Sequence, residues 1–316
     1  MIIREATTSD VNEIVEVLIA SLGTVDLELS PEIWNFKHVN NPFGASLVLV
    51  AEEEDRIIGV RAFMRWNWMM DNKVYNCFRA VDTATHPNHQ GKGIFKKLTL
   101  KAIEIAQQSG YSFVFNTPNE NSRPGYLKMG WVIVNKVNIA IIPAWNSFWR
   151  IFEDSFVYQL NLNVTSDKLD QLCASWNERL SKQGKTFTPK SSSFLKWRYE
   201  DNPLRKYEVV ATESLYVALY VKKRGKISEL RIAECIFADE KKGVNALSKL
   251  IKYYSNKFGV QIISYSPNVL KLNKIALLGN YGPILTIRKL NLNLDESNDL
   301  VDISNWNSSI GDLELF

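Results

Sequence analysis

The sequence has few of the residues that build metal or disulfide sites. Its 316 residues include three cysteines and three histidines. Cys77, Cys173 and Cys235 are too widely spaced for a disulfide framework or a metal-ligand motif. Cys77 and Cys235 lie in strand-like runs, which favours buried core thiols. We therefore expect no metal.

Long apolar runs and charge of one sign are also missing. No segment approaches the ~20 apolar residues of a membrane-spanning helix. The start, Met-Ile-Ile-Arg-Glu, lacks the charged and apolar regions of a signal peptide. We expect a cytoplasmic protein without a membrane span. The formal net charge of +4 comes without a basic stripe, which favours small anionic ligands over nucleic acid.

The strongest functional signal lies at residues 83–95. This segment predicts a strand end, a polar loop containing Gly91 and Gly93, and a helix to about residue 109. Glycines allow close approach of a ligand, and a helix N-terminus attracts anions through its free N–H groups and its dipole. Neither P-loop nor dinucleotide-binding spacing is present. The loop alone does not separate a phosphate site from an ordinary strand-to-helix turn.

A second motif gives this loop a context. Residues 113–116 predict a short buried strand, and Tyr-Leu-Lys-Met-Gly-Trp follows at 126–131. Here the sequence resembles the GNAT acyltransferase superfamily. Gln90-Gly-Lys-Gly93 is similar to its Gln/Arg-x-x-Gly loop, and residues 126–131 are similar to its Tyr-x-Lys-x-Gly-aromatic segment. Phe95 departs from the pattern, because the superfamily usually has Gly or Ala there.

The resemblance implies an acyl-CoA site. Tyr126 would give a proton to the leaving thiolate, with a core aromatic as the alternative reading. Strand amides would hold the thioester and pantetheine, and the loop would hold the pyrophosphate. The implied acyl-CoA residues are Thr83, Ala84, Thr85, Gln90, Gly91, Lys92, Gly93, Ile94, Phe95, Asn119 and Ser122.

Two residues are candidates for the base that deprotonates an acceptor amine. Asp82 lies in an apolar strand, where burial raises the pKa of a carboxyl group towards a useful value. The alternative is an ion pair with Arg79 or Arg61. His38 is the second candidate, in an Asn-Pro segment on the expected acceptor side.

Arg61, Arg65 and Arg79 are candidates for substrate binding. They fall on successive expected strands, and the spacing of Arg61 and Arg65 puts both on one strand face. Facing the acceptor cleft, they suit a diphosphate or a carboxylate. Facing outward, they are solubilising charges.

The length suits two domains, and a faint repeat supports a duplication. Residues 36–43 and 197–204 share an aromatic-basic start and an Asn-Pro-apolar end, and Thr-Ser-Asp occurs at 8–10 and 165–167. We expect a GNAT domain with the acyl-CoA site at 1–145 and a degenerate GNAT-like domain shaping the acceptor pocket at 146–316. In the second half, Glu240 and Lys241 align with Gln90 and Gly91 of the loop. An acidic residue and a non-glycine at these positions would oppose a pyrophosphate, so we expect one acyl-CoA site per chain.

The element pattern predicts an α/β class with mixed, mostly antiparallel sheets flanked by helices. In the first half we expect strands at 1–5, 46–53, 56–66, 73–85, 112–116 and 131–142, with helices at 9–21, 93–109 and 121–129. In the second we expect strands at 156–164, 207–212, 215–222, 228–237, 260–264 and 283–291, with helices at 166–182, 241–257 and 268–278. The polar tail from Asp295 reads as a surface strap or a partly disordered segment.

The segment 118–131 is similar to GNAT proteins of bacterial surface-polysaccharide pathways. That resemblance implies N-acylation of a nucleotide-linked amino sugar, with dTDP as the nucleotide and acetyl-CoA or 3-hydroxybutanoyl-CoA as donor. Two alternatives stay open: an acyltransferase for a peptide, aminoacyl or antibiotic amine, and a non-catalytic CoA-binding protein. The sequence does not indicate an oligomeric state.

Overall fold

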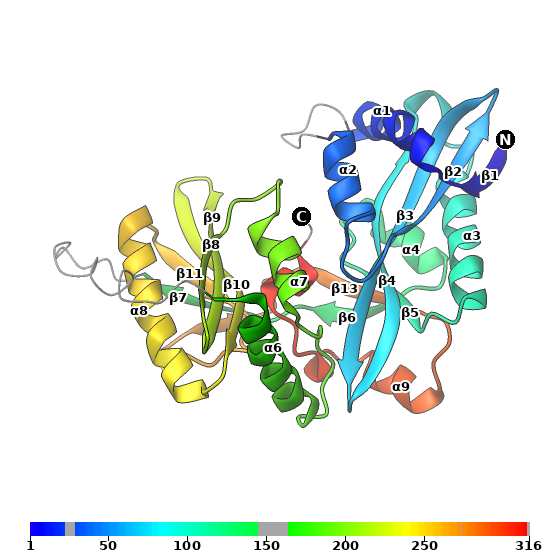
Figure 1. Cartoon of the computed structure of the whole chain (residues 1–316). Coiled ribbons are helices and arrows are strands. Elements are labelled where there is room, and N and C mark those ends of the chain that lie inside the picture. Colours follow the sequence, from blue (N-terminus) through cyan, green and yellow to red (C-terminus); the bar gives the residue numbers. More distant parts are fainter. Residues whose placement is uncertain (23–28, 145–163, 273, 315–316) are drawn as a thin grey trace. The chain divides into compact units, whose positions relative to one another are not determined.

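The computed structural model describes residues 1–22, 29–144, 164–272 and 274–314. They form two compact units, each built on its own sheet (Figure 1). The first unit comprises Met1–Trp68, Lys73–Asn135 and Ile284–Asp302, and the second comprises Met69–Asn72, Lys136–Pro283 and the described residues from Ile303. The units interleave along the chain, whereas the sequence suggested one cut near residue 145.

The first unit holds a seven-stranded sheet in the order β1-β2-β3-β4-β5-β13-β6. Its strands are β1 (Ile2–Glu5), β2 (Leu47–Glu53), β3 (Arg56–Met70), β4 (Lys73–Thr85), β5 (Phe113–Asn116), β6 (Val132–Lys136) and β13 (Ile284–Lys289). Its helices are α1 (Val11–Leu22), α2 (Pro31–His38), α3 (Ile94–Gln108), α4 (Arg123–Lys128) and α9 (Leu294–Asp299). Strands β1, β2 and β3 pair antiparallel, while β4 and β5 pair parallel.

Helix α3 covers the core of this unit. Ile94, Leu98, Ala102 and Ala106 recur at helical spacing and are buried in one cluster with residues of β2, β3, β4 and β5. The expected sheet-facing stripe is therefore confirmed. Because this stripe fixes the helix against the sheet, it also fixes the loop that precedes the helix.

The ends of β4 and β5 are not paired to each other. The parallel register runs only from Cys77–Phe113 to Arg79–Phe115, while β4 continues to Thr85. Beyond Arg79, β5 therefore no longer satisfies the backbone groups of β4 on that side. Free main-chain amides at the end of a parallel strand are available to a ligand.

The second unit has a six-stranded sheet in the order β12-β7-β11-β10-β9-β8. Its strands are β7 (Ile139–Pro143), β8 (Glu208–Thr212), β9 (Leu215–Arg224), β10 (Ile227–Phe237), β11 (Ile262–Tyr265) and β12 (Leu277–Gly279). Its helices are α6 (Ser166–Ser181), α7 (Ser192–Leu195), α8 (Glu240–Phe258) and α10 (Ile310–Leu313). The parallel pairing of β10 with β11 ends at Arg231–Ser264, and β10 continues to Phe237. The second sheet thus repeats the opening between β4 and β5.

The two sheets exchange strands. β13, from the second half of the chain, pairs antiparallel with β5, and β7, from the first half, pairs antiparallel with β11. Each sheet is therefore completed by a strand from the other half. The mixed α/β class and the tandem arrangement are confirmed.

Three expected elements differ from the structure or fall outside it. The expected strand 131–142 is two strands, β6 and β7, which join different sheets. The expected helix 268–278 is wrong: its described residues are largely irregular and lead into β12, with Ile275 and Leu278 exposed. The expected strand 156–164 lies almost wholly outside the described residues.

The tail after Asp295 was predicted wrongly. It forms α9 and α10 with a short 3-10 turn between them. Leu300 and Trp306 are fully buried, and Leu313 is nearly so. The few apolar residues of this acidic segment are spaced irregularly, so their burial leaves no periodic signal in the sequence.

Candidate functional site

A cavity of about 520 Å³ lies where β4 ends and α3 begins. Ser21 and Lys96 line it together with eight residues expected at the acyl-CoA site, namely Thr83, Ala84, Thr85, Gln90, Gly91, Gly93, Ile94 and Phe95. The structure thus brings most of the expected site together. Lys92, Asn119 and Ser122 are not part of this lining; the Asn119 side chain instead accepts hydrogen bonds from the backbone N–H and the hydroxyl of Ser122.

The glycine loop leaves the start of α3 open. Gly91 and Gly93 have φ of +77° and +74°, in the left-handed region that favours glycine. Gly93 is the N-cap of α3 and has no side chain to bond the first N–H groups. A Cβ on either glycine would find no atom within 4 Å. Free N–H groups that face open space at a helix N-terminus form an anion site.

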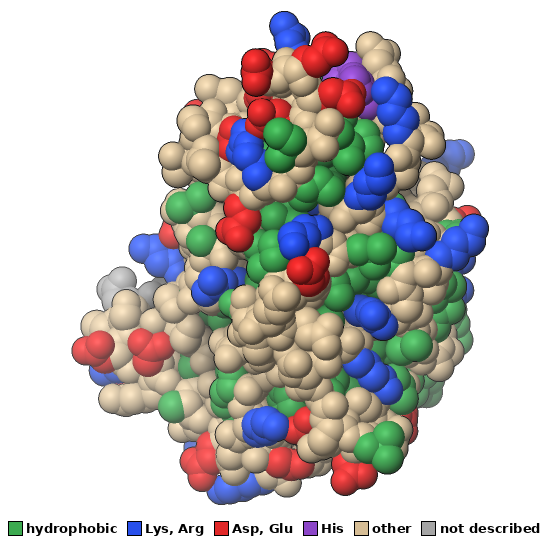
Figure 2. Space-filling model, turned by 90° about the vertical axis from the view of Figure 1, so that its right-hand side faces the viewer, with side chains coloured by type: hydrophobic (Ala, Val, Ile, Leu, Met, Phe, Trp, Pro, Cys, Tyr) green, Lys and Arg blue, Asp and Glu red, His purple; other side chains and the backbone are tan. Residues whose placement is uncertain are grey.

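Basic side chains surround this helix start. Lys92, Lys96 and Lys97 are exposed, and the first turn of α3 carries no acidic residue. Figure 2 looks onto the side on which α3 lies in Figure 1, and Lys and Arg side chains are spread over this face among Asp and Glu side chains. A phosphate-rich ligand is favoured there by both the helix dipole and these charges.

Tyr126 is buried beside the cavity. Its ring packs edge-on against Phe95 at 5.5 Å and against Trp131 at 5.0 Å between ring centroids. Arg61 Nη1 donates a hydrogen bond of 2.7 Å to its hydroxyl oxygen. Since Arg61 can only donate, the hydroxyl proton of Tyr126 must point to another acceptor. Phe95, the departure from the superfamily pattern, packs on Tyr126 and also lines the cavity.

Arg61 is fully buried without a carboxylate partner. Within the described part of the chain, its Nε and Nη2 atoms have no hydrogen-bond partner. Its guanidinium lies 4.8 Å from the ring centroid of Phe63 and 5.3 Å from that of Tyr126. A buried guanidinium that donates to one hydroxyl is costly, and proteins keep such groups where they serve a function.

The three candidate arginines differ in exposure. Arg61 and Arg79 are fully buried, whereas Arg65 is exposed. Arg79 lies over Trp66 and Phe115, away from the rings that contact Arg61. Arg61 and Arg65 lie four residues apart in β3 without a register shift between them, so the two positions differ in exposure and not in strand face.

The two candidates for the base contact each other. His38 Nε2 lies 2.8 Å from Asp82 Oδ2, and His38 Nδ1 lies 2.9 Å from Ser46 Oγ. Lys37 Nζ also reaches Asp82 Oδ2, at 2.5 Å. The partners of Asp82 are thus Lys37 and His38 on α2, and not the expected alternatives Arg79 or Arg61. Asp82 has φ +30° inside β4, an unusual conformation that re-aims its side chain.

These contacts reverse the expected pKa of Asp82. Burial alone would raise the pKa of its carboxyl group, but the charge of Lys37 and the hydrogen bond from His38 outweigh burial and hold it well below its usual value. Burial lowers the pKa of His38 despite its bond to Asp82. At neutral pH an ionised Asp82 accepts from a neutral His38, whose Nδ1 then accepts from Ser46.

Comparison with known proteins decides the nature of the first unit. Residues 2–134 match the model of the acetyltransferase (GNAT) domain. The greater part of the first unit is thus similar to a GNAT acetyltransferase domain. The expected acyltransferase class is thereby confirmed, while no curated protein sequence matches the chain.

Solved structures show the same fold over nearly the whole chain. A probable N-acyltransferase of Enterococcus faecalis, otherwise of unknown function, is 10% identical with a TM-score of 0.65 and covers 92% of this chain and 72% of its own. A GCN5-related N-acetyltransferase of Anabaena variabilis is 10% identical with a TM-score of 0.63, covering 92% and 73%. Saccharomyces cerevisiae N-myristoyltransferase with bound myristoyl-CoA is 10% identical with a TM-score of 0.56, covering 100% and 85%.

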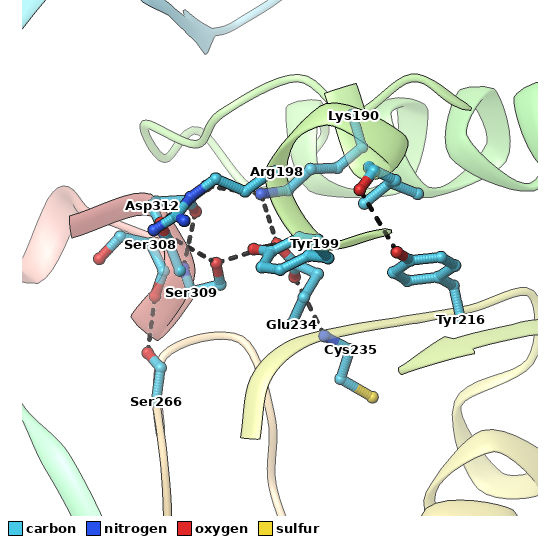
Figure 3. Close-up of polar contacts among 12 residues, drawn as sticks. Lys190, Arg198, Tyr199, Tyr216, Glu234, Cys235, Ser266, Ser308, Ser309 and Asp312 are labelled. Atoms are coloured by element: carbon cyan, nitrogen blue, oxygen red, sulfur yellow. Dashed lines mark hydrogen bonds and ion pairs between the residues drawn. The ribbon is translucent and has the colours of Figure 1, made fainter. Parts of the chain in front are cut away.

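The second unit contains counterparts of Asp82 and of its partner His38. Glu234 stands three residues before the end of β10, as Asp82 does in β4, and the Tyr199 hydroxyl donates to Glu234 Oε2 at 3.1 Å (Figure 3). Tyr199 holds the place of His38 in the repeated Asn-Pro segment. The sequence repeat indicated the Asn-Pro segment but not the acidic residue, because the residues that flank Asp82 in β4 are not similar to those that flank Glu234 in β10.

In the second unit, the Glu234 carboxyl group is buried and paired with other side chains. Lys190 Nζ lies 2.7 Å from Glu234 Oε2 and 2.6 Å from Asp312 Oδ1, and Ser309 Oγ donates to Glu234 (Figure 3). All four side chains are almost fully buried. Burial and the nearby Asp312 carboxylate raise the pKa of Glu234 despite Lys190. The C-terminal segment therefore covers, in the second unit, the carboxyl group that corresponds to Asp82.

The described residues lack two features. No cluster of three or more His, Cys, Asp or Glu side chains is arranged to hold a metal ion. No described helix has the length and apolarity to cross a membrane. All three cysteines are buried and unpaired.

Proposed function

We propose that the first unit transfers an acyl group from acyl-CoA to an amine. The observation that carries this proposal is the cavity at the start of α3, where open main-chain N–H groups and lysines suit a pyrophosphate. The structural relative with bound myristoyl-CoA supports an acyl-CoA donor for this fold. Thr83, Ala84 and Thr85 then offer the main chain of β4 to the donor's thioester and pantetheine arm.

The reaction uses Tyr126 at the leaving group. The amine nitrogen attacks the thioester carbonyl, the C–S bond breaks, and the thiolate takes the proton of the Tyr126 hydroxyl. Arg61 holds that hydroxyl from its oxygen side at 2.7 Å, which directs the proton away from Arg61 and stabilises the phenolate that forms. The phenolate is later reprotonated by solvent.

Asp82 orients the acceptor nitrogen. A carboxyl group with a lowered pKa is a weak base, so it accepts a hydrogen bond from the ammonium group and the excess proton leaves to solvent. Both contacts with Lys37 and His38 fall on Oδ2. Oδ1 is the oxygen that we assign to the acceptor. His38 serves as a positioning residue for the Asp82 carboxylate.

For the acceptor we propose a nucleotide-linked amino sugar, with dTDP as the nucleotide and acetyl-CoA or 3-hydroxybutanoyl-CoA as donor. This choice rests on the resemblance of residues 118–131 to enzymes of surface-polysaccharide pathways. The exposed Arg65 is a candidate for binding the diphosphate.

A thiol-release assay tests the reaction and the acceptor together. Each donor is offered to a panel of dTDP-linked amino sugars, and to peptide, aminoacyl and aminoglycoside amines. Turnover with an amino sugar supports the full proposal. Turnover only with another amine retains the acyltransferase and replaces the acceptor. If one CoA binds and no amine is acylated, the protein is a CoA-binding protein.

Tyr126→Phe tests the assignment of the proton donor. The substitution keeps the ring contacts with Phe95 and Trp131 and removes the hydroxyl. We expect turnover to fall by about 10²–10⁴, with CoA affinity within about twofold. Unchanged turnover would remove Tyr126 from the mechanism.

A further inference from the structure

The second unit keeps a cleft at the place of the acyl-CoA cavity. A cavity of about 440 Å³ lies at the end of β10, lined by α6, the start of α8 and the segment after β11. These elements correspond to β4, α1, α3 and the segment after β5 in the first unit. Asn268 follows β11 as Asn119 follows β5, each directly after a proline. The position of a ligand cleft has therefore survived in a unit whose acid is sealed.

The features that would hold CoA in this cleft are gone. The loop between β10 and α8 is short, and the side chain of its N-cap, Asp239, accepts from Lys242 N–H. The helix N-terminus is thus satisfied by the protein itself. Gly243 lies within α8, where an added Cβ would stand 2.4 Å from Phe237. This glycine accommodates an aromatic ring, and it is not part of a phosphate loop.

Side chains supply positive charge in place of the missing loop. Arg179, Lys185 and Lys271 line the cleft together with one acid, Glu240, and the carboxylate of Asp239 also acts on Arg179. In the described structure, none of these three basic side chains forms an ion pair or hydrogen bond. Three unpaired cations in one concave site attract an anion.

Aromatic rings form the floor beneath Arg179. Its guanidinium lies 4.5 Å from the ring centroid of Trp176 and 5.0 Å from that of Phe237. These contacts hold the guanidinium over the rings, and burial lowers the pKa of Arg179.

We propose that the cleft of the second unit is a non-catalytic binding site for a small phosphate-bearing molecule. Arg179 lies over the two rings and presents its N–H groups to the phosphate, and Lys185 and Lys271 add charge. The volume of about 440 Å³ suits a nucleoside phosphate and is small for the whole of CoA. The site does not depend on acyl transfer in the first unit.

Calorimetry on the full chain tests this proposal with two probes, dTDP and inorganic pyrophosphate. Each is titrated first alone and then with saturating CoA, which fills the first-unit cavity. We expect one pyrophosphate per chain to bind in the presence of CoA. Because dTDP also fits the acceptor site proposed for the first unit, dTDP binding is assigned to the second-unit cleft only where Arg179→Gln weakens it. The variants Arg179→Gln and Lys271→Gln should each weaken this binding about tenfold or more, since each removes a charge-assisted contact.

Lys182→Gln is the matched control. Lys182 follows α6 directly, is exposed and pairs with Glu178, outside the cleft. This variant should bind the probes like the unmodified protein.

No probe binding with CoA present, or binding that Arg179→Gln leaves unchanged, would overturn the proposal. CoA binding and turnover report separately on the proposed function, so the two ideas fail independently. Pyrophosphate binding as tightly as dTDP would support a site that recognises phosphate alone.

Discussion

At the scale of single residues, Arg61 shows how function and stability oppose each other. The guanidinium is fully buried, donates to Tyr126 and lies among aromatic rings. Replacing a poorly paired buried charge by an apolar side chain of similar length is often neutral or stabilising. Arg61→Met should therefore keep or raise the thermal midpoint of unfolding while turnover falls about 10- to 100-fold.

CoA affinity separates this electrostatic role of Arg61 from packing. Without the guanidinium, the Tyr126 phenolate that forms on proton transfer is less stable, so turnover should fall while CoA affinity stays unchanged. Arg56→Met, at an exposed position of the same strand, serves as the control. A large loss of stability together with normal turnover would make Arg61 a structural residue only.

Asp82 leads to a prediction about stability and pH. Its pKa is lowered in the folded state, so the stabilisation is present above the unfolded value of 3.8 and is lost as pH falls below it. At pH 7, Asp82→Asn should reduce the free energy of unfolding by roughly 1.5–3 kcal/mol, because Lys37 and His38 lose a charged acceptor. Between about pH 4 and pH 2 the difference should shrink. Urea unfolding at several pH values measures it, with the exposed Glu120→Gln as control.

At the scale of elements, the glycines at the two ends of α3 offer a matched pair. Gly93 at the N-cap has φ +74°, and Gly110 just after the helix has φ +78°; a Cβ on either meets no atom within 4 Å. Alanine at either position should cost a similar amount, about 1–2 kcal/mol, through left-handed strain. Only Gly93→Ala places a methyl group in the cavity.

CoA affinity should therefore separate these two variants. We expect Gly93→Ala to bind CoA at least tenfold more weakly, while Gly110→Ala binds it normally in the same titration. Equal affinities would show that the loop at Gly93 does not contact the ligand, and the anion site would have to lie elsewhere.

Elements with strong local signals were predictable from the sequence. Helix α3, the loop before it and the antiparallel strands follow from apolar periodicity and glycine spacing. The contact of His38 with Asp82 was not predictable, because it joins α2 to β4 across distant parts of the chain and depends on the unusual backbone of Asp82. The partner of Tyr126 was missed for the same reason, since a strand pattern does not show which ring an arginine meets.

At the scale of the whole molecule, the exchange of β7 and β13 could not be derived from local patterns. The sequences of β7 and β13 both have ordinary strand patterns. Backbone hydrogen bonding alone would allow either strand to pair with either sheet. The duplication itself left a trace, in the Asn-Pro segments and in the paired acids Asp82 and Glu234. What diverged is the chemistry around each acid: Asp82 is partly open, whereas Glu234 is sealed by Lys190 and the C-terminal segment.

This divergence predicts one CoA per chain. Among the described residues, only the first unit has a glycine loop before a helix without a side-chain cap, while Asp239 caps the start of α8 and Phe237 packs against Gly243. A second CoA would have to displace the Asp239 cap of α8 and the buried Phe237 ring. The free-energy cost of this displacement exceeds the stabilisation from a new phosphate contact. Calorimetric titration with CoA should give a single site whose affinity falls in Gly93→Ala and is unchanged in Arg179→Gln. Two equivalent sites, or a site that Arg179→Gln weakens, would mean that the second unit still binds the acyl donor.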